Sequence, residues 1–430
     1  MEKFNSPFLQ ELFDRGFIHQ CTHLEELDNE SAVHPITLYI GFDATAKSLH
    51  VGNLMAIMMM RIAQRHGHKP IVLMGGATTK VGDPSGKDKS RPVLTHEDIQ
   101  DNIQSIQKSF SKYLTFGNEP SDSLTVNNNE WLGKLGYLDF LAHYGCHFSI
   151  NRMLTFDSVK LRLEREQPLS FLEFNYMILQ AYDFLELHRR YGCSLQAGGS
   201  DQWGNILNGV ELIRRIENTS AFGLTAPLIT TSSGKKMGKS EQGAVWLNAD
   251  ALSPFDYWQY WRNTEDNDVI RFLKFYTDIS VQEINQWSSN DINHLKIRLA
   301  DEATILAHGT ACLAEIHQSI AQVFGVEDFH VDVLGMDDKG NKVLKSALSI
   351  VKIYLEDLQK GIPAFSILAQ SGLVASNGEA RRLIKGQGCK INDTLVSDEN
   401  QVITPDHLMD PGVLKVSAGK KRHVLLQPIA

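Results

Sequence analysis

The chain has 430 residues, of which 42% are hydrophobic and 22% are charged, and its formal net charge is −9. This length exceeds what one hydrophobic core supports, so we expect two or three domains of ordinary globular composition. The acidic balance excludes a protein that attracts nucleic acid over its whole surface, although residues 362–430 carry +2 and the rest carries −11.

The five cysteines are widely separated and form no CxxC pair: Cys21, Cys146, Cys193, Cys312 and Cys389. This spacing indicates reduced thiols and argues against a structural zinc site, so we predict no metal site built from the protein. The N-terminus lacks a basic-then-apolar signal pattern, and the longest uncharged apolar stretch, residues 51–60, is about half a membrane span. We therefore expect a cytoplasmic protein with no membrane partner.

Short apolar runs alternate with helical stretches through the first two hundred residues. The pattern predicts a strand at 37–41, a helix at 54–64 and a strand at 70–74, and further strands at 124–126, 195–197 and 225–229. Thr95 followed by Asp98 is typical of a helix start with a capping box. Strands separated by helices predict a mostly parallel α/β sheet with ligand sites at the carboxyl ends of its strands.

The later part of the chain changes character twice. Residues 249–351 are mainly helical by pattern, and a boundary follows at Gly361. Residues 362–430 then form a small unit in which Gly, Asn and Asp turns separate short apolar runs.

Two segments are suited to phosphate binding. The first runs from Tyr39 to Asn53, where a strand ends and a helix begins, so that free N–H groups and the helix dipole face a ligand. Gly52 permits close approach of a ligand, and Thr45 and His50 add donors. Taken alone, His50 is more simply interpreted as a hydrogen-bonded histidine at a helix start.

The second segment is a glycine-containing loop with three lysines, which can close over a triphosphate and neutralise the charge of departing pyrophosphate. It reads Ser232-Ser233-Gly234-Lys235-Lys236-Met237-Gly238-Lys239-Ser240. A lysine-rich loop by itself is more often solvated surface.

Together, the two segments resemble the signature motifs of the class I aminoacyl-tRNA synthetases, usually written HIGH and KMSKS. Here they read His50-Val51-Gly52-Asn53 and Lys236-Met237-Gly238-Lys239-Ser240, in the expected order and about 185 residues apart. Asn53 replaces the second histidine of the family motif and can still donate a hydrogen bond. The resemblance implies that Thr45, His50, Lys236 and Lys239 stabilise the transition state, and that Asp43, Gly52, Asn53 and Lys239 contact ATP.

The segment from Gly75 to Arg91 combines glycines with a basic tail, which an ordinary turn does not explain. The resemblance makes it a mobile loop beside the phosphates, with Lys87 and Arg91 contacting ATP. It also places Asp83 beside the substrate amino group.

A helix is predicted at 171–191, with Tyr176, Gln180 and Asp183 on one polar stripe. From spacing alone, this stripe fits a structural polar network or an exposed face as well as a binding site. Beyond it, residues 193–205 predict a strand, a Gly-Gly turn and a helix start, where Asp201 is placed to accept ribose hydroxyls.

These two segments resemble the bacterial-type tyrosyl-tRNA synthetases, and the resemblance extends over essentially the whole chain from about Phe4. It implies that Tyr39 and Asp183 bind the substrate phenol and that Tyr176, Gln180 and Asp83 bind its ammonium group. Gln202 would lie near the carboxylate and the α-phosphate, with Gly199 and Asp201 along the ribose. Ile40 stands where the family often has cysteine, so one ribose contact is expected to be lost.

Residues 363–393 resemble a small RNA-binding domain that is shared with a ribosomal small-subunit protein. In that resemblance Arg381, Arg382, Lys385 and Lys421 face RNA phosphates. A solvated charged surface is the alternative interpretation of the same residues.

The resemblance thus predicts a Rossmann-like catalytic domain with a connective insertion at 1–248, an α-helical domain and linker at 249–360, and a small α+β RNA-binding domain at 361–430. The implied function is a tyrosine–tRNA ligase with L-tyrosine, ATP and tRNA(Tyr) as substrates. Mg²⁺ accompanies ATP, no cofactor is permanently bound, and a homodimer is expected. The alternatives are a tryptophanyl enzyme and a catalytically idle RNA-binding descendant; the Tyr39 and Asp183 pair and the intact lysine loop argue against them.

Overall fold

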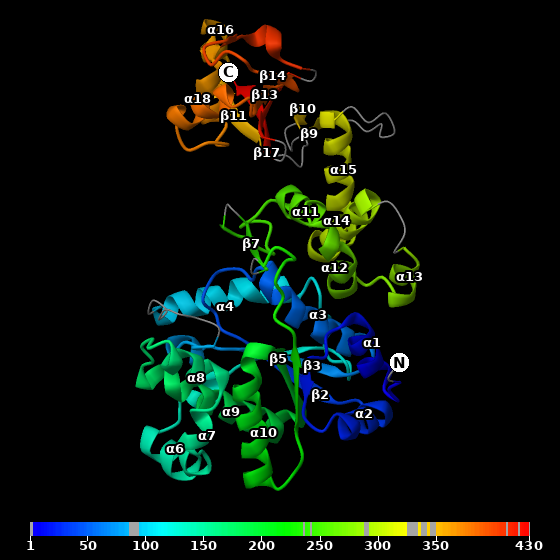
Figure 1. Cartoon of the computed structure of the whole chain (residues 1–430), viewed down its shortest axis with the longest axis vertical. Helices are drawn as coiled ribbons and strands as arrows, with labels where there is room; N and C mark the ends of the chain where they lie inside the picture. Colours follow the sequence, from blue (N-terminus) through cyan, green and yellow to red (C-terminus); the bar gives the residue numbers. More distant parts are fainter. Residues whose placement is uncertain are drawn as a thin grey trace. The chain divides into compact units, whose positions relative to one another are not determined.

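The computed structural model describes residues 3–85, 94–234, 237–240, 243–287, 292–324, 334–336, 342–344, 350–409, 412–419 and 422–429. The chain divides into two compact units, residues 1–252 with 260–307 and residues 253–259 with 308–430 (Figure 1). No helix among the described residues is long and apolar enough to cross a bilayer.

The first unit is built on a six-stranded sheet with the order β1-β6-β5-β2-β3-β4. Its strands are β1 (Gln20–Cys21), β2 (Thr37–Phe42), β3 (Lys69–Met74), β4 (Leu124–Asn127), β5 (Cys193–Gly199) and β6 (Phe222–Ala226). All neighbouring pairs are parallel except β1 with β6. Parallel strands bring their carboxyl ends to one edge, and the strand order reverses between β5 and β2, where such sheets bind ligands.

Fifteen helices are described between Pro7 and Phe324. They are α1 (Pro7–Arg15), α2 (Leu24–Val33), α3 (Val51–Arg65), α4 (His96–Phe110), α5 (Asn129–Leu132), α6 (Tyr137–His143), α7 (Ile150–Met153), α8 (Asp157–Glu164), α9 (Phe171–Tyr191), α10 (Trp203–Glu217), α11 (Pro254–Arg262), α12 (Val269–Tyr276), α13 (Val281–Gln286), α14 (Ile292–His308) and α15 (Thr310–Phe324). Short 3₁₀ turns η1 (Thr78–Lys80), η3 (Ser200–Gln202) and η4 (Asp266–Asp268) lie between them.

Local sequence signals set the ends of the longest helix, α9. It starts at Ser170, whose hydroxyl accepts from the Glu173 backbone while the Glu173 carboxylate bonds back to Ser170. It ends at Gly192, whose positive φ of 62° suits glycine. The capping box predicted at Thr95 and Asp98 is likewise present at the start of α4.

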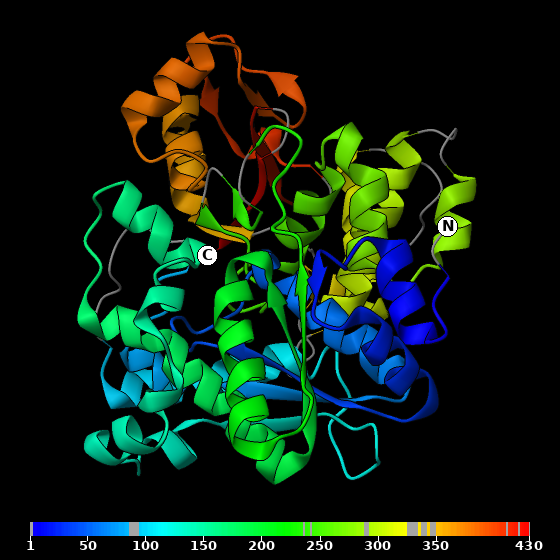
Figure 2. The ribbon, with the colours of Figure 1, turned by 60° about the horizontal axis from the view of Figure 1, so that its bottom comes forward.

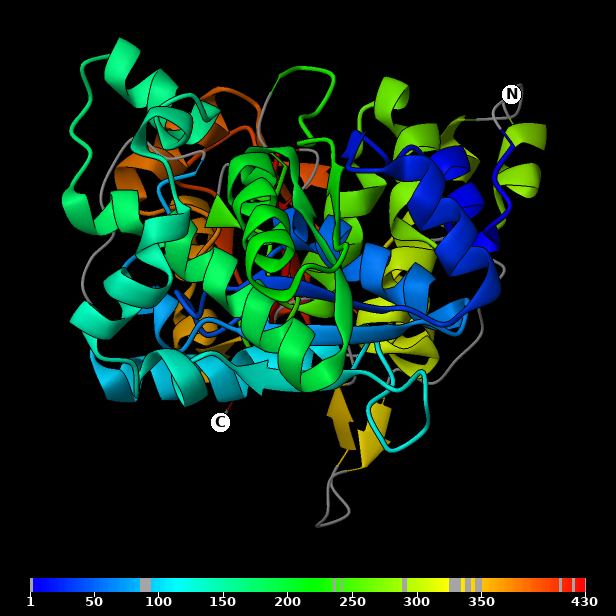
Figure 3. The ribbon, with the colours of Figure 1, turned by 90° about the horizontal axis from the view of Figure 1, so that it is seen from below.

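The core of this unit lies between the sheet and α9 and α10. These two helices pack on each other and against β5 and β6, and both lie over the strands in Figure 2 and Figure 3. Tyr39 from β2 and Phe184 from α9 are almost fully buried there, with ring centroids 5.3 Å apart. Helix α3 instead packs against β2 and β3.

The second unit contains a five-stranded sheet with the order β11-β17-β16-β13-β14. Its elements are β11 (Ile350–Tyr354), α16 (Leu355–Lys360), β12 (Ile362–Pro363), α17 (Ala364–Gln370), α18 (Asn377–Lys385), β13 (Cys389–Ile391), β14 (Thr394–Leu395), β15 (Val402–Ile403), β16 (Leu414–Ala418) and β17 (Arg422–Ile429), with β9 (Leu334–Met336) and β10 (Lys342–Leu344) before them. Helices α17 and α18 contact each other, and apolar side chains of both join the core beneath the sheet.

The predicted α/β class, with its parallel sheet and a C-terminal strand-containing unit, is confirmed. Two details were wrong. The last strand of the large sheet was predicted at 225–229 but lies at Phe222–Ala226 and ends before Pro227, which cannot donate to a ladder. The helical pattern predicted through residue 351 extends two residues too far, because Ile350 and Val351 already belong to β11, which pairs in parallel with β17. The division into domains at 248 and 360 stays a prediction.

Candidate active site

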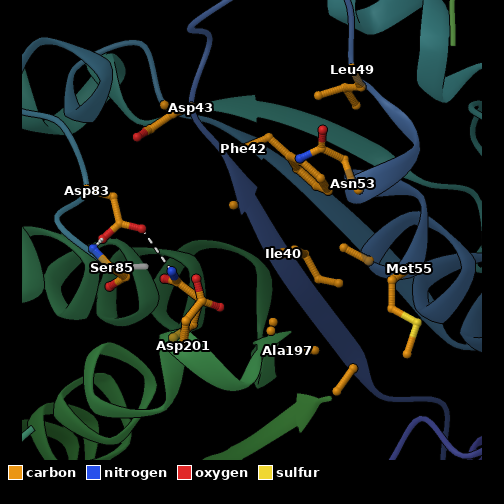
Figure 4. Close-up of a pocket in the computed structure, with 18 of the residues that line it drawn as sticks. Ile40, Phe42, Asp43, Leu49, Asn53, Met55, Asp83, Ser85, Ala197 and Asp201 are labelled. Carbon is orange, nitrogen blue, oxygen red and sulfur yellow. Dashed lines mark hydrogen bonds between the residues drawn. The ribbon is translucent and has the colours of Figure 1, made fainter. Parts of the chain in front are cut away.

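A cavity of about 640 Å³ opens at the carboxyl ends of the parallel strands. Phe42 and Asp43 border it where β2 ends, Gly199 where β5 ends and Ala226 where β6 ends. In Figure 4, Asp43 lies just past the tip of the strand that carries Ile40 and Phe42. The predicted residues that line the cavity are Tyr39, Asp43, Thr45, His50, Gly52, Asn53, Asp83, Tyr176, Gln180, Asp183, Gly199, Asp201 and Gln202.

One end of the cavity presents a buried carboxyl group and a buried phenol. Asp183 is 2% exposed, and its oxygens accept from Trp131 Nε1 at 2.7 Å and from Asn128 Nδ2 at 3.0 Å. Tyr39 is 1% exposed, and its hydroxyl has no hydrogen-bond partner among the described residues. A substrate hydroxyl that reached this end could donate to Asp183 and accept from Tyr39, which would satisfy the Tyr39 donor.

Burial sets the protonation of both groups. It raises the pKa of Asp183 from 3.8 to about 7, and the hydrogen bonds from Asn128 and Trp131 offset this only in part. Burial and the neighbouring Asp183 raise the pKa of Tyr39 well above its usual value, so its phenol stays protonated and can donate.

Asn128 and Trp131 were missed from the sequence, although both hold Asp183. Asn128 comes directly after β4, so the rule that ligand-facing residues follow parallel strands could have found it. Trp131 lies in the short helix α5, and no periodicity or motif in the sequence connects it with Asp183.

A chain of amide and carboxylate groups forms another wall. Gln202 Nε2 donates to Asp83 Oδ2 at 2.8 Å, and Gln180 Nε2 donates to Gln202 Oε1 at 3.3 Å. Asn205 Nδ2 donates to Gln180 Oε1 at 3.0 Å, which leaves the amide of Gln180 oriented toward Gln202. The dashed line from Asp83 in Figure 4 marks the first of these bonds. Acceptors arranged in this way suit an ammonium group.

The polar stripe predicted on helix α9 faces this cavity throughout. Tyr176 Oη donates to Asp43 Oδ1 at 3.2 Å, which also accepts from Thr78 Oγ1 at 3.1 Å. Tyr176 and Asp183 lie two helical turns apart on α9, and both line the cavity. Tyr176 is also bonded to Asp43, the residue that follows β2. Of the alternatives left open by its spacing, an exposed face is excluded for Tyr176 and Asp183, which are buried.

The two predicted phosphate motifs meet in the structure. The Val51 nitrogen donates to the Val245 carbonyl at 2.9 Å, and His50 forms an antiparallel bridge with Trp246. A Cβ on Gly238, whose φ is +89°, would lie 2.7 Å from the Gly52 nitrogen. Glycine is therefore required at 238 both by backbone conformation and by the close approach of the two motifs.

His50 and Asn53 cap helix α3. His50 Nδ1 accepts from the Gly52 nitrogen at 3.0 Å, and Asn53 Oδ1 accepts from the His50 nitrogen at 3.2 Å. The contacts of His50 thus match its interpretation as a hydrogen-bonded histidine at a helix start. The side chains of His50 and Asn53 nevertheless also line the cavity, at the positive end of helix α3.

Some predicted residues are not brought to the site by the described structure. Lys87, Arg91, Lys236 and Lys421 lie outside the described residues, and only the backbone of Lys239 is described, in the strand pair β7 (Lys239–Ser240) and β8 (Gly243–Ala244). In the second unit, Arg381 lies 3.7 Å from the centre of the Phe365 ring and 2.6 Å from Glu399. Arg382 and Lys385 are exposed on α18.

Comparisons with known proteins agree with this geometry. Residues 31–325 match the family described as tRNA synthetases class I (W and Y). The chain is 54% identical over 429 residues to a tyrosine–tRNA ligase of Caulobacter vibrioides and 51% identical over 423 residues to one of Rickettsia felis, covering 98–99% of this chain and 99% of each relative.

The chain belongs to the tyrosine–tRNA ligases of class I. A solved structure agrees: the C-terminally truncated mitochondrial tyrosyl-tRNA synthetase of Aspergillus nidulans is 30% identical, with a TM-score of 0.66 over 75% of this chain and 95% of that chain. The predicted family and enzyme class are confirmed. The tryptophanyl alternative shares the family description, but the full-length relatives are tyrosine–tRNA ligases.

The raised pKa of Asp183 gives this ligase a testable pH dependence. A phenol donates to the ionised carboxylate, so we expect the Kd for tyrosine to rise by up to about ten-fold for each pH unit below about 7. Equilibrium dialysis at pH values from about 5.5 to about 8, a range that spans the raised pKa, would measure the Kd for tyrosine. Asp183→Asn should remove the dependence, and a dependence that persists in that variant would assign it to another group.

The raised pKa of Asp183 has the opposite effect on the stability of the fold, which falls rather than rises with increasing pH. Because the pKa of Asp183 is higher in the folded than in the unfolded chain, the native state holds the proton more tightly. The contribution of Asp183 to stability is therefore full below about pH 4 and is lost as the pH rises through about 7.

Proposed function

We propose that this chain activates L-tyrosine with ATP, giving tyrosyl-adenylate and pyrophosphate, and then transfers the tyrosyl group to the 3′-terminal adenosine of tRNA(Tyr). The observation that carries the amino-acid assignment is the buried Asp183 beside the unpartnered Tyr39 hydroxyl, which together fit a phenol. The family supports ATP and tRNA as the other substrates.

Tyrosine would lie with its phenol at Asp183 and its ammonium group at Asp83, Gln180 and Tyr176. Its carboxylate would then reach Gln202, near the carboxyl end of β5. ATP would lie across the start of α3, with its ribose at Gly199 and Asp201 and its phosphates at the helix N-terminus. Mg²⁺ would enter bound to the triphosphate, as is usual for nucleotide substrates.

The chemistry needs positioning and charge stabilisation rather than a covalent enzyme intermediate. The tyrosine carboxylate attacks the α-phosphate in line, and pyrophosphate leaves with the electrons of the broken P–O bond. Thr45 and His50, together with Lys236 and Lys239, would stabilise the negative charge that develops on the phosphates. The adenosine hydroxyl of tRNA then attacks the carbonyl carbon of the mixed anhydride, and AMP leaves.

ATP–pyrophosphate exchange, run separately with each of the twenty amino acids, tests this proposal. We expect exchange with tyrosine to exceed exchange with every other amino acid. Exchange that depends on tryptophan instead would assign the site to the other branch of the family. The absence of exchange with all twenty would overturn the proposed reaction.

Lys239→Ala should separate binding from chemistry. We expect tyrosine binding to stay nearly intact and adenylate formation to slow by at least about ten-fold, the scale of one lost transition-state contact. Single-turnover kinetics with a tyrosine titration would measure both. Weaker ground-state binding with an unchanged rate would contradict the assigned role of Lys239.

The second unit would supply contacts to tRNA. Arg382 and Lys385 are exposed on α18 and can reach phosphates, although Lys385 lies 3.4 Å from Glu399; Arg381 is held more closely, by Glu399 and Phe365. We assign Arg381 mainly to fixing α18 and assign Arg382, Lys385 and Lys421 to the RNA, which leaves the solvated-surface alternative to be tested by mutation.

A homodimer fits the exposed apolar side chains from α6 to the start of α9. They are Tyr137, Leu138, Ile150, Leu161, Leu163, Phe171 and Leu172, each 43–78% exposed. Large apolar side chains that stay exposed over one segment are typical of interaction surfaces. Leu138→Glu should lower the dimer fraction at micromolar concentration in sedimentation experiments; a wild-type protein that sediments as a monomer would contradict the assignment.

A further inference from the structure

Three charged residues beyond the cavity hold the segment that leads into the lysine motif. They are Glu265, Asp268 and Arg271, named here the η4 cluster because they lie on or beside the turn η4. Asp268 Oδ2 accepts from the Ser232 backbone nitrogen at 2.7 Å, and Arg271 Nη2 donates to the Thr230 carbonyl at 2.6 Å.

Side-chain contacts reinforce these backbone contacts. The Glu265 carboxylate accepts from the hydroxyl groups of Ser232 and Ser233, both at 2.6 Å. Arg271 also donates to Asp268 Oδ1 at 2.6 Å, so the two charged groups orient each other. Asp268 is 2% exposed, and a buried carboxylate that is paired in this way is costly to displace.

The held segment connects the cavity to the lysines. Leu228 to Thr230 line the cavity after β6, and Lys235 and Lys236 follow Gly234 directly in the sequence. The Met237 nitrogen donates to the Ile229 carbonyl at 3.2 Å, which closes this stretch into a loop. The η4 cluster therefore holds Thr230, Ser232 and Ser233 in a loop whose base borders the cavity.

We propose that Glu265, Asp268 and Arg271 are positioning residues for adenylate formation, acting through the lysine motif rather than on substrate. This inference rests on the proposed function and deepens it. The cluster binds the main chain at Thr230 and Ser232, so it sets where the following lysines approach the triphosphate. Misplacement by about 1 Å can cost up to about a hundred-fold in rate, so a contact outside the cavity can matter to the chemistry.

The predicted signature is kinetic. Glu265→Ala and Asp268→Asn should each slow single-turnover adenylate formation by about ten-fold and leave the Kd for tyrosine unchanged. Glu265→Gln should restore part of the rate, because its amide oxygen can accept from one serine hydroxyl group while its NH2 group can donate to the other. Glu265 is exposed, so its variants should keep the wild-type Tm.

Asp266→Asn is the matched control. Asp266 lies on the same turn but pairs with Lys296 at 2.5 Å rather than with the loop. Removal of its charge should leave the rate of adenylate formation within about two-fold of wild type, because Asp266 makes no contact with the described residues of the loop.

Coupling to Lys239 distinguishes a positioning role from a general loss of structure. In a Lys239→Ala background, Glu265→Ala should slow the reaction by a clearly smaller factor than in the wild type, since both changes act through one loop. Equal factors in the two backgrounds would overturn the inference, as would a wild-type rate in both Glu265→Ala and Asp268→Asn. If the wild type itself lacked tyrosine-dependent exchange, the proposed function would fail first, before the cluster was tested.

Discussion

Replacing Asp183 with alanine is expected to reduce kcat/KM for tyrosine activation by about 10³-fold, the scale of leaving two or three buried donors unpaired at about 1–3 kcal/mol each. The donors that would lose their acceptor are Trp131 Nε1, Asn128 Nδ2 and the substrate phenol. Phenylalanine brings no hydroxyl group, so its activation should fall much less. The tyrosine-to-phenylalanine ratio should therefore narrow, and pyrophosphate exchange with both amino acids would measure it.

The reason for this expectation is general. A site that hydrogen-bonds a substrate hydroxyl rejects the analogue that lacks it, and the tyrosyl-tRNA synthetases are themselves the standard example of this rule. Glu186→Gln is a matched control, because Glu186 is a buried acid on the same helix that pairs with Arg190 outside the cavity. An Asp183→Ala variant that is folded and keeps the wild-type ratio would show that the phenol is recognised elsewhere.

Removing residues 350–430 should reduce tRNA charging by at least about a hundred-fold, because the phosphate contacts of the second unit are lost. Tyrosine-dependent pyrophosphate exchange should stay within about two-fold of wild type, since the described residues that line the cavity all lie between 39 and 276. The cut is placed before β11 because a cut at 361 would leave that strand without its partner β17.

Arg382→Ala sharpens this test without removing a whole unit. It should weaken tRNA binding. It should also reduce the slope of log K against log salt concentration by roughly one, as expected for one lost phosphate contact. Arg381→Ala in parallel should also lower the Tm, because Arg381 packs on Phe365 and pairs with Glu399. Full charging by the truncated chain would contradict a major role for the second unit.

Much of the large sheet could be predicted because its signals are local. The strand at β2 and the helix α9 are marked by apolar runs, by the Ser170 capping box and by Gly192. The polar residues at strand ends followed from parallel topology, which places them along one edge. Asp43, Asp83 and Gln202, which the family resemblance named, line the cavity at this edge.

The parts that could not be predicted depend on partners distant in sequence. The first two residues of β11 were included in the helical stretch because the strand that pairs with β11, β17, begins some seventy residues later. Trp131 was missed because only the fold brings its indole to Asp183. Asn53 caps helix α3 by accepting from the backbone nitrogen of His50. The replacement of the family's histidine by asparagine does not by itself predict this contact.

The bridge between His50 and Trp246 has a consequence for the folding of the chain during its synthesis. Its two sides are separated by nearly two hundred residues, so the closure of this loop carries a high entropic cost and belongs to the late, non-local steps of folding. During synthesis, at about 5–20 residues per second, the nucleotide side of the cavity cannot exist until Trp246 has emerged from the ribosome. Before that moment the growing chain already carries the residues proposed to bind tyrosine and the Asn205 that orients Gln180, while the nucleotide side of the cavity is still incomplete.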